Sequence, residues 1–286
     1  MADGGEAGLG QFTTEDGIAI AFDDEGEGRP LVLLHGLMAH RGFFPAQRAL
    51  AGRFRLITID LRGHGDTATG PRLPDVETLA RDVGALAAEL DLEGAVGIGW
   101  SLGAAVLWHL LTGPETHRFD GAVVVDMTPC VRNAADWSLG LETELCDART
   151  QAIESDFKAF AAAAGAAIFA APDAAGAPHP LAGWAAEEFA RNDGAPIAAL
   201  WSSLVEQDFR PRLAAVRQPT LVVHGALSHL YGPETAEHLA AALPRARALR
   251  FERSGHAPHL EQPELFNAAL IEFAASLPPV RTSEHA

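Results

Sequence analysis

One pentapeptide constrains the fold of this chain more than any other feature, because it places a serine between two glycines. Gly99-Trp100-Ser101-Leu102-Gly103 joins two apolar runs, the second at helical spacing, in the stretch AVGIGWSLGAAVLWHLLT. The pattern predicts a buried strand, a tight turn and a helix. Glycines on both sides of Ser101 are typical of a turn so sharp that the central residue is strained and the flanking backbones almost touch. Such a turn lifts the serine hydroxyl clear of the sheet.

The rest of the chain alternates between expected strands and expected helices. Apolar runs predict strands at Leu31–Leu34, Phe54–Asp60, Gly121–Val125, Thr220–Val223 and Ala248–Glu252, and periodic patterns predict helices at Asp75–Leu90, near Pro233–Leu243 and near Pro263–Leu277. This alternation predicts an α/β fold with a mostly parallel, doubly wound sheet, whose ligands bind at the carboxyl ends of the strands. Before it, Asp16-Gly17 predicts an antiparallel hairpin between Gln11–Thr14 and Ile18–Asp23.

The alternation is interrupted once. From about Cys130 to Val216 the chain has alanine-rich amphipathic stretches, at Asp156–Ala170, Ala182–Arg191 and Pro196–Val205, and no convincing strand. We therefore expect residues 11–129 and 217–278 to form the α/β core, and residues 130–216 to form a helical insertion. Residues 1–10 and 279–286 are expected to be flexible tails.

The composition of the chain indicates which kinds of molecule it can bind and in which compartment it is expected. The 286 residues are 48% hydrophobic and carry a formal net charge of −17, which disfavours nucleic acid and anionic membranes and favours small neutral or cationic substrates. The two cysteines, Cys130 and Cys146, have neither metal-site nor disulfide-framework spacing, which predicts reduced thiols and a cytoplasmic protein. No export signal or membrane span is apparent, so no membrane association is expected.

A serine hydroxyl becomes a useful nucleophile only when a base takes its proton and a third group orients that base. Among the 12 histidines, His256 lies just past the last expected strand, where a loop can bring its imidazole to the carboxyl edge of the sheet. His259 is a weaker candidate. Surface or packing roles are expected for His64, His109, His117, His179, His238 and His285.

Taken in order, these motifs resemble the α/β-hydrolase family. The turn around Ser101, the pair His35-Gly36, the stretch Asp60–Gly65 (DLRGHG) and Gly255-His256 occur in the order typical of that family. The resemblance implies that Ser101 is the nucleophile and His256 the base. It also implies that the helical insertion is a lid over the active site.

The acid of the triad departs from the common family pattern. Most members have an aspartate in the loop that here reads His224-Gly225-Ala226-Leu227-Ser228-His229, with a serine at the expected place. The nearest carboxylate, Glu234, is expected in the first turn of a helix, where an acidic residue is favourable for the helix dipole alone. Asp126 ends the strand after the one that carries the nucleophile, and some esterase-like and thioesterase-like members have a similar Asp-x-x-Pro followed by Gly-x-x-Ser. Asp126 is therefore the preferred acid.

Two backbone amides complete the expected site. The N–H groups of Leu102 and, by the resemblance, Leu37 would form an oxyanion hole. Aromatic residues of the insertion suggest an apolar pocket together with Trp100, Met38 and Met127; they are Trp137, Trp184, Trp201, Phe157, Phe160, Phe169 and Phe189. No dinucleotide, phosphate or metal-binding motif appears, so no cofactor and no metal are expected.

The leading hypothesis is a serine hydrolase that cleaves a small, mainly apolar carboxylic ester, or a thioester, through an acyl-enzyme. Hydrolysis of lactones, amides or C–C bonds and acyl transfer stay open, because they use the same triad with a different pocket. A ligand-binding receptor on the hydrolase fold is the alternative from another class of function.

Overall fold

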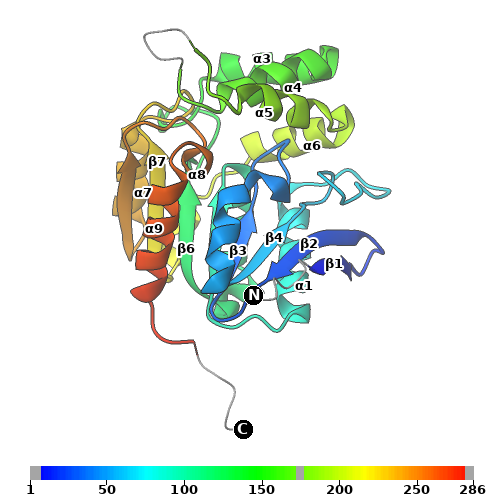
Figure 1. Ribbon diagram of the computed structural model, residues 1–286. Helices are drawn as coiled ribbons and strands as arrows, with labels where there is room; N and C mark the ends of the chain where they lie inside the picture. The colour runs from blue at the N-terminus through cyan, green and yellow to red at the C-terminus, as the bar shows by residue number, and fades with distance from the viewer. Residues whose placement is uncertain (1–7, 172–176, 281–286) are drawn as a thin grey trace.

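An eight-stranded sheet runs through the molecule (Figure 1). The computed structural model describes residues 8–171 and 177–280, and within them the strand order is β1-β2-β4-β3-β5-β6-β7-β8. The strands are β1 Gly8–Thr13, β2 Ala19–Glu25, β3 Pro30–Leu34, β4 Arg55–Ile59, β5 Ala95–Trp100, β6 Phe119–Val125, β7 Thr220–Gly225 and β8 Ala246–Phe251. β2 is antiparallel to both β1 and β4, whereas every other neighbouring pair is parallel. The predicted mostly parallel sheet with an antiparallel N-terminal hairpin is confirmed.

Alternate residues of the central strands enter two separate hydrophobic clusters, one on each face of the sheet. Val32 and Val222 belong to the cluster that contains helices α1 (Val76–Glu89), α2 (Leu102–Leu111) and α7 (Pro233–Ala242). The neighbouring residues Leu33 and Leu221 belong to the other cluster, which contains α9. Two faces that both need burial explain why these strands are continuous apolar runs. The second face is covered by α9 (Pro263–Ala275), the short helix α8 (Pro258–Glu261) and the 3₁₀ segment η2 (Pro45–Gly52).

The N-terminal strand begins earlier than the sequence predicts. Gly8, Leu9 and Gly10 already pair with β2, so they belong to the hairpin and not to a tail. Gly17 has a φ of 85° in the hairpin turn, a value that favours glycine. Of the other tail positions, Pro279 and Val280 follow α9 without helix or strand, and residues 1–7 and 281–286 lie outside the described residues, as does His285.

Four helices that we call the cap helices lie between β6 and β7 in the chain and across one end of the sheet (Figure 1). They are α3 Thr143–Ser155, α4 Phe157–Ala167, α5 Ala182–Ala190 and α6 Gly194–Val205. The last three match expected helical stretches, whereas α3 was not predicted. In its sequence, TELCDARTQAIES, only Cys146 and Ile153 are buried, so the apolar signal is weak.

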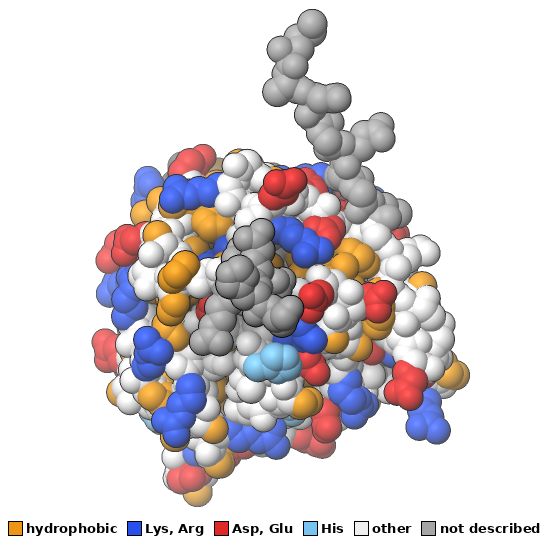
Figure 2. All heavy atoms as spheres, turned by 90° about the horizontal axis from the view of Figure 1, so that it is seen from below, with side chains coloured by type: hydrophobic (Ala, Val, Ile, Leu, Met, Phe, Trp, Pro, Cys, Tyr) orange, Lys and Arg blue, Asp and Glu red, His pale blue; other side chains and the backbone are white. Residues whose placement is uncertain are grey.

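The opposite end of the molecule has a mixed surface. Figure 2 shows that end, where acidic and basic side chains are interspersed among small apolar areas. Among the described residues, no helix combines the length and the apolar character needed to span a bilayer.

Candidate active site

Ser101 occupies a strained turn between β5 and α2. Its φ and ψ are 53° and −116°, a conformation that costs energy in a residue with a side chain. A Cβ on Gly99 would collide with the carbonyl oxygen of Gly103, and a Cβ on Gly103 would collide with the carbonyl oxygen of Leu34. Both glycines are therefore required by the close approach of strand and helix. The Ser101 N–H donates to the carbonyl of Val125 on β6 at 3.1 Å, which fixes the turn against the neighbouring strand.

His256 lies in the loop between β8 and α8, and its ring contacts a carboxylate. Its Nδ1 lies 2.7 Å from Oδ2 of Asp126. The indole N–H of Trp100 donates to the carbonyl oxygen of His256 at 2.7 Å. The backbone N–H of His256 donates to the carbonyl of Ile168, just past α4, at 2.8 Å. The imidazole of His256 is thus oriented by its contact with Asp126, and the backbone of His256 is held at both its N–H and its carbonyl group.

Three donors converge on the carboxylate of Asp126, the residue that follows β6. Besides His256, the hydroxyl of Ser228 donates to Oδ2 at 2.7 Å, and the N–H of Gly225 donates to Oδ1 at 3.3 Å. Ser228 is the serine at the place where the common family pattern has the acid, and here its hydroxyl binds the carboxylate that follows the neighbouring strand. The side chain of Glu234 is exposed, and it makes no hydrogen bond or ion pair with the described residues.

The loop that carries His35 and Gly36 lies against the serine turn. A Cβ on Gly36 would lie 3.3 Å from Cβ of Ser101, which is tighter than an ordinary contact. His35 supports this loop: its Nε2 accepts from the N–H of Leu61 at 3.0 Å, while its Nδ1 lies 2.8 Å from the Gly36 carbonyl oxygen. The N–H groups of Leu37 and Leu102 find no acceptor among residues 8–171 and 177–280. These two amides are free to bind an oxyanion.

Ser101 and His256 line one cavity of about 290 Å³ beneath the cap helices. Its walls are mainly apolar, and five of the residues proposed from the sequence contribute to them: Met38, Trp100, Phe160, Phe189 and Trp201. The remaining aromatic candidates and Met127 lie elsewhere. Trp184, for example, packs against Phe43 with ring centroids 4.4 Å apart.

Two polar side chains that line the cavity were not anticipated from the sequence. Tyr231, the only tyrosine of the chain, lies in the loop after β7 with its ring centroid 6.3 Å from that of His256, and burial raises the pKa of its hydroxyl. Arg149 comes from the unpredicted helix α3, and burial lowers the pKa of its guanidinium. The Gly-x-x-Ser loop was a signal for the neighbourhood of Tyr231. Arg149 had none, because the face that α3 turns inward is set by tertiary packing.

His259, the weaker candidate base, is packed inside the core. Its ring lies edge-on to Trp100, with centroids 4.7 Å apart, and neither ring nitrogen bonds to a described residue. Burial lowers its pKa to about 3, so the imidazole is neutral. It has a packing role and does not line the cavity.

The half-buried carboxylate of Glu261 on α8 joins the loop that carries His256 to the cap helices. One of its oxygens accepts from the N–H of Gly255 and the other from the N–H of Ala170, each at 2.7 Å. Burial raises its pKa, while the two backbone donors act in the opposite direction. Through this carboxylate the loop before His256 and the chain beyond α4 share one anchor.

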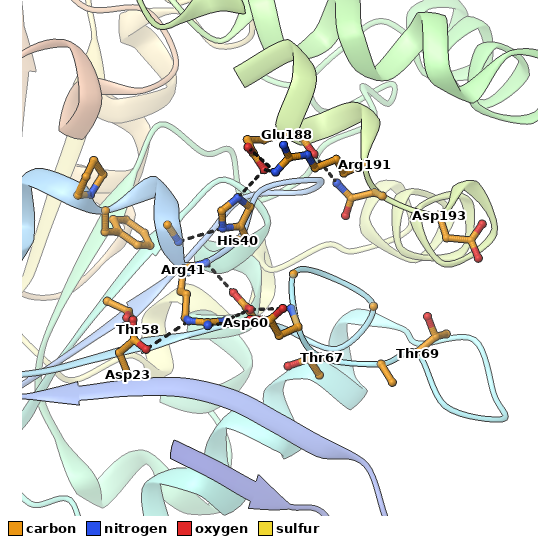
Figure 3. A pocket seen from close by; sticks show the side chains of 18 of the residues that line it. Asp23, His40, Arg41, Thr58, Asp60, Thr67, Thr69, Glu188, Arg191 and Asp193 are labelled. Atoms are coloured by element: carbon orange, nitrogen blue, oxygen red, sulfur yellow. Dashed lines mark hydrogen bonds and ion pairs between the residues drawn. The ribbon is translucent and has the colours of Figure 1, made fainter. Parts of the chain in front are cut away.

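A second cavity, of about 640 Å³, lies beside the cap and has a different character (Figure 3). Several of its charged side chains form ion pairs: Arg41 pairs with Asp60 and with Asp66, and His40 lies 3.2 Å from Glu188. Asp60 also accepts the backbone N–H of Arg41 at 2.7 Å, consistent with a structural role. Neither Ser101 nor His256 reaches this cavity, so the smaller one is the candidate active site.

Metal ligands and reactive thiols would support other chemistries in the part of the chain that the structure describes. It contains no group of three or more His, Cys, Asp or Glu side chains arranged to hold a metal ion. Cys130 and Cys146 are buried free thiols, and burial raises the pKa of each.

Comparisons with known proteins agree with the fold. Residues 31–269 match the family model described as the alpha/beta hydrolase family. The chain is 31% identical to pimeloyl-[acyl-carrier protein] methyl ester esterase of Nitrosomonas europaea, over 87% of this chain and 96% of that protein. It is 26% identical to the AB hydrolase superfamily protein YisY of Bacillus subtilis, over 92% of this chain and 98% of that protein.

A solved structure extends the agreement to three dimensions. The esterase EaEST of Exiguobacterium antarcticum superimposes with a TM-score of 0.87 at 24% identity, over 94% of this chain and 100% of that one. At this identity the likeness concerns the fold alone. Together with the family match over most of the sequence, it leads to one conclusion: the chain belongs to the alpha/beta hydrolase family.

Proposed function

We propose that this chain is a carboxylic-ester hydrolase that forms an acyl-enzyme on Ser101, with His256 as the base and Asp126 as the acid. The observation that carries the proposal is the 2.7 Å contact between Nδ1 of His256 and the Asp126 carboxylate, in a loop that lines the same cavity as Ser101. The relatives named as methyl ester esterases, at 31% to 33% identity, support an ester as the substrate.

The geometry supports a two-step acyl transfer. Oγ of Ser101 attacks the ester carbonyl carbon while Nε2 of His256 takes the hydroxyl proton. Asp126 accepts the Nδ1–H bond, which fixes the tautomer and stabilises the imidazolium. The carbonyl oxygen becomes an oxyanion that the amides of Leu37 and Leu102 bind, and the N-terminus of α2 adds positive potential. As the intermediate collapses, His256 protonates the departing alcohol. Water then repeats these steps on the acyl-enzyme and releases the acid.

The cap helices are proposed to act as the lid of this site. Phe160 on α4, Phe189 on α5 and Trp201 on α6 provide apolar walls for the cavity that contains Ser101. Apolar walls favour binding of hydrocarbon groups, and they exclude water from the charges that develop during acyl transfer. A small, mainly apolar ester fits this environment.

The proposal is tested by hydrolysis of p-nitrophenyl butyrate by the wild type, Asp126→Asn and Glu234→Gln. The Asn side chain cannot hold the same tautomer of His256, so we expect kcat to fall by about 10⁴-fold, as for the equivalent change in other serine triads. Glu234→Gln changes an exposed side chain and should retain wild-type activity. Thermal melts of both variants control for folding. Activity lost in Glu234→Gln and kept in Asp126→Asn would reject the assignment of the acid.

The nucleophile is tested separately. A fluorophosphonate should label the wild type on Ser101, as read by mass spectrometry of the digested protein, and should not label Ser101→Ala. Failure to label the folded wild type would contradict the serine mechanism.

A further inference from the structure

Arg149 differs from every other residue around the candidate nucleophile. Of the described residues that line the cavity with Ser101, it alone carries a permanent charge, and its neighbours are mostly apolar or aromatic. It extends from α3, and its guanidinium carbon lies 5.7 Å from the centroid of the Trp201 ring. The cavity therefore offers one fixed positive charge on an otherwise apolar wall.

The guanidinium of Arg149 has no anionic partner within the described residues. No ion pair or hydrogen bond joins it to residues 8–171 or 177–280. Among these residues, all other arginines that are at least partly buried pair with a carboxylate: Arg29, Arg41, Arg55, Arg62, Arg118, Arg132 and Arg210. Arginines that lack a carboxylate are otherwise exposed to solvent, where water satisfies them. Arg149 is thus a half-buried cation without a carboxylate partner among the described residues.

Leaving such a charge unpaired costs free energy. A guanidinium in an apolar cavity loses part of its hydration, and burial indeed lowers the pKa of Arg149. The Trp201 ring offsets part of this cost by a cation–π contact. A carboxylate would offset more, because the planar guanidinium matches its two oxygens in a bidentate pair.

We propose that Arg149 binds an ionised carboxylate on the substrate, so that the preferred substrates are half-esters of small dicarboxylic acids. This inference rests on the proposed function, because it assumes that the ester group lies at Ser101. A single guanidinium balances one negative charge, which favours a carboxylate over a doubly charged phosphate. The hydroxyl of Tyr231 lies in the same cavity and donates at 3.6 Å to the sulfur of Met127, a weak acceptor. It can donate to the same anion.

The proposed preference for an anionic substrate contrasts with the negative net charge of the whole chain. The net charge of −17 led us to expect neutral or cationic substrates. Long-range repulsion of that kind is screened over roughly 8–10 Å in physiological salt. Inside the cavity, the nearest fixed charge is that of Arg149.

The test compares two methyl esters of matched length, monomethyl adipate and methyl hexanoate, which differ by the terminal carboxylate. Proton release in a pH-stat gives kcat/KM for both. We expect the wild type to prefer monomethyl adipate, and Arg149→Gln to reduce the ratio of the two kcat/KM values by about tenfold to a hundredfold, the range for hydrogen bonds to charged groups. Arg149→Lys should keep part of the preference. Arg132→Gln, which removes the same charge at the ion pair with Asp147 outside the cavity, should keep all of it.

Binding gives a readout that does not depend on turnover. In the Ser101→Ala protein, calorimetry should show tighter binding of monomethyl adipate than of methyl hexanoate. The added change Arg149→Gln should abolish this difference in affinity. A wild type without preference for the anionic ester, or an Arg149→Gln variant that loses activity on both esters equally, would overturn the role of Arg149 and leave the ester hydrolase intact. If Ser101 fails to react with the fluorophosphonate while anion binding depends on Arg149, the proposed hydrolysis fails and the anion site stands.

Discussion

Three residues of the candidate site, Met38, Ser101 and Asp126, have positive φ angles of 67°, 53° and 46°. Such conformations cost about 1–3 kcal/mol each in residues other than glycine. Among the described residues only one further non-glycine residue, Asp91, has a positive φ. Backbone strain is therefore concentrated around the cavity. Hydrogen bonds to the neighbouring strands hold this strained backbone in place, because the N–H groups of Ser101 and Asp126 each donate to a carbonyl oxygen of the adjacent strand.

The hydroxyl of Ser228 is expected to position the acid. Ser228→Ala removes a donor from Oδ2 of Asp126, the oxygen that also contacts His256. Hydrogen bonds to charged groups contribute about 1.5–3 kcal/mol, and part of this should appear as a fall of about tenfold in kcat. KM should change little, because Ser228 does not line the cavity.

Ser228→Thr is the control for this prediction, since it keeps the hydroxyl and should restore most of kcat on p-nitrophenyl butyrate. A KM that rises while kcat stays constant would show that Ser228 acts on substrate binding and not on Asp126.

At the scale of elements, the strands and the serine turn were predictable because their signals are local. Continuous apolar runs give buried strands, and the two glycines at positions 99 and 103, on either side of Ser101, give the turn. Helix α3 was missed because its buried positions are few, and α8 because it has only four residues. Contacts such as that between His256 and Ile168 leave no pattern in the sequence, since they join backbone groups of segments far apart in the chain.

The turn itself can be tested by adding one carbon. Gly99→Ala places a Cβ against the backbone of Gly103 and Ala104, which cannot move without separating β5 from α2. Overpacking in a core costs about 1–3 kcal/mol, and we expect the upper end of this range or more in the free energy of unfolding measured with urea.

Gly183→Ala is the matched control, because a Cβ at this position of α5 meets nothing within 4 Å. It should raise the free energy of unfolding by about 0.5–1 kcal/mol through helix propensity. Equal destabilisation by both substitutions would mean that the tight approach at Gly99 is not what requires glycine.

For the whole molecule, three buried histidines link stability to pH. Burial is the largest cause that lowers the pKa values of His35, His64 and His259, each from 6.5 to about 3. The rings of His35 and His64 lie 4.9 Å apart, so protonation of one also opposes protonation of the other. All three are neutral in the folded protein. In the unfolded chain they bind protons near their ordinary pKa, so stability is fully present above 6.5 and is lost as the pH falls toward 3.

Replacing His259 by phenylalanine should weaken this pH dependence. The ring already packs among Phe44, Trp100 and Phe266, an environment that suits an apolar aromatic side chain. Between neutral pH and about pH 4, His259→Phe should lose about 3 kcal/mol less of its free energy of unfolding than the wild type, as measured by urea denaturation at each pH.

The exposed His117 provides the control for this measurement. His117→Gln should follow the wild-type curve. Parallel curves for the wild type and His259→Phe would mean that His259 titrates in the same way in the folded and unfolded chains.

The hydrogen bonds that join His256 to Ile168, and the carboxylate of Glu261 that joins Gly255 to Ala170, also restrict how a substrate can come and go. If the end of α4 moved outward, it would pull His256 away from Asp126. The contact between the imidazole and the carboxylate would then have to form again each time a substrate entered. We therefore expect a substrate to enter from another side of the cap, while this end of α4 stays in place.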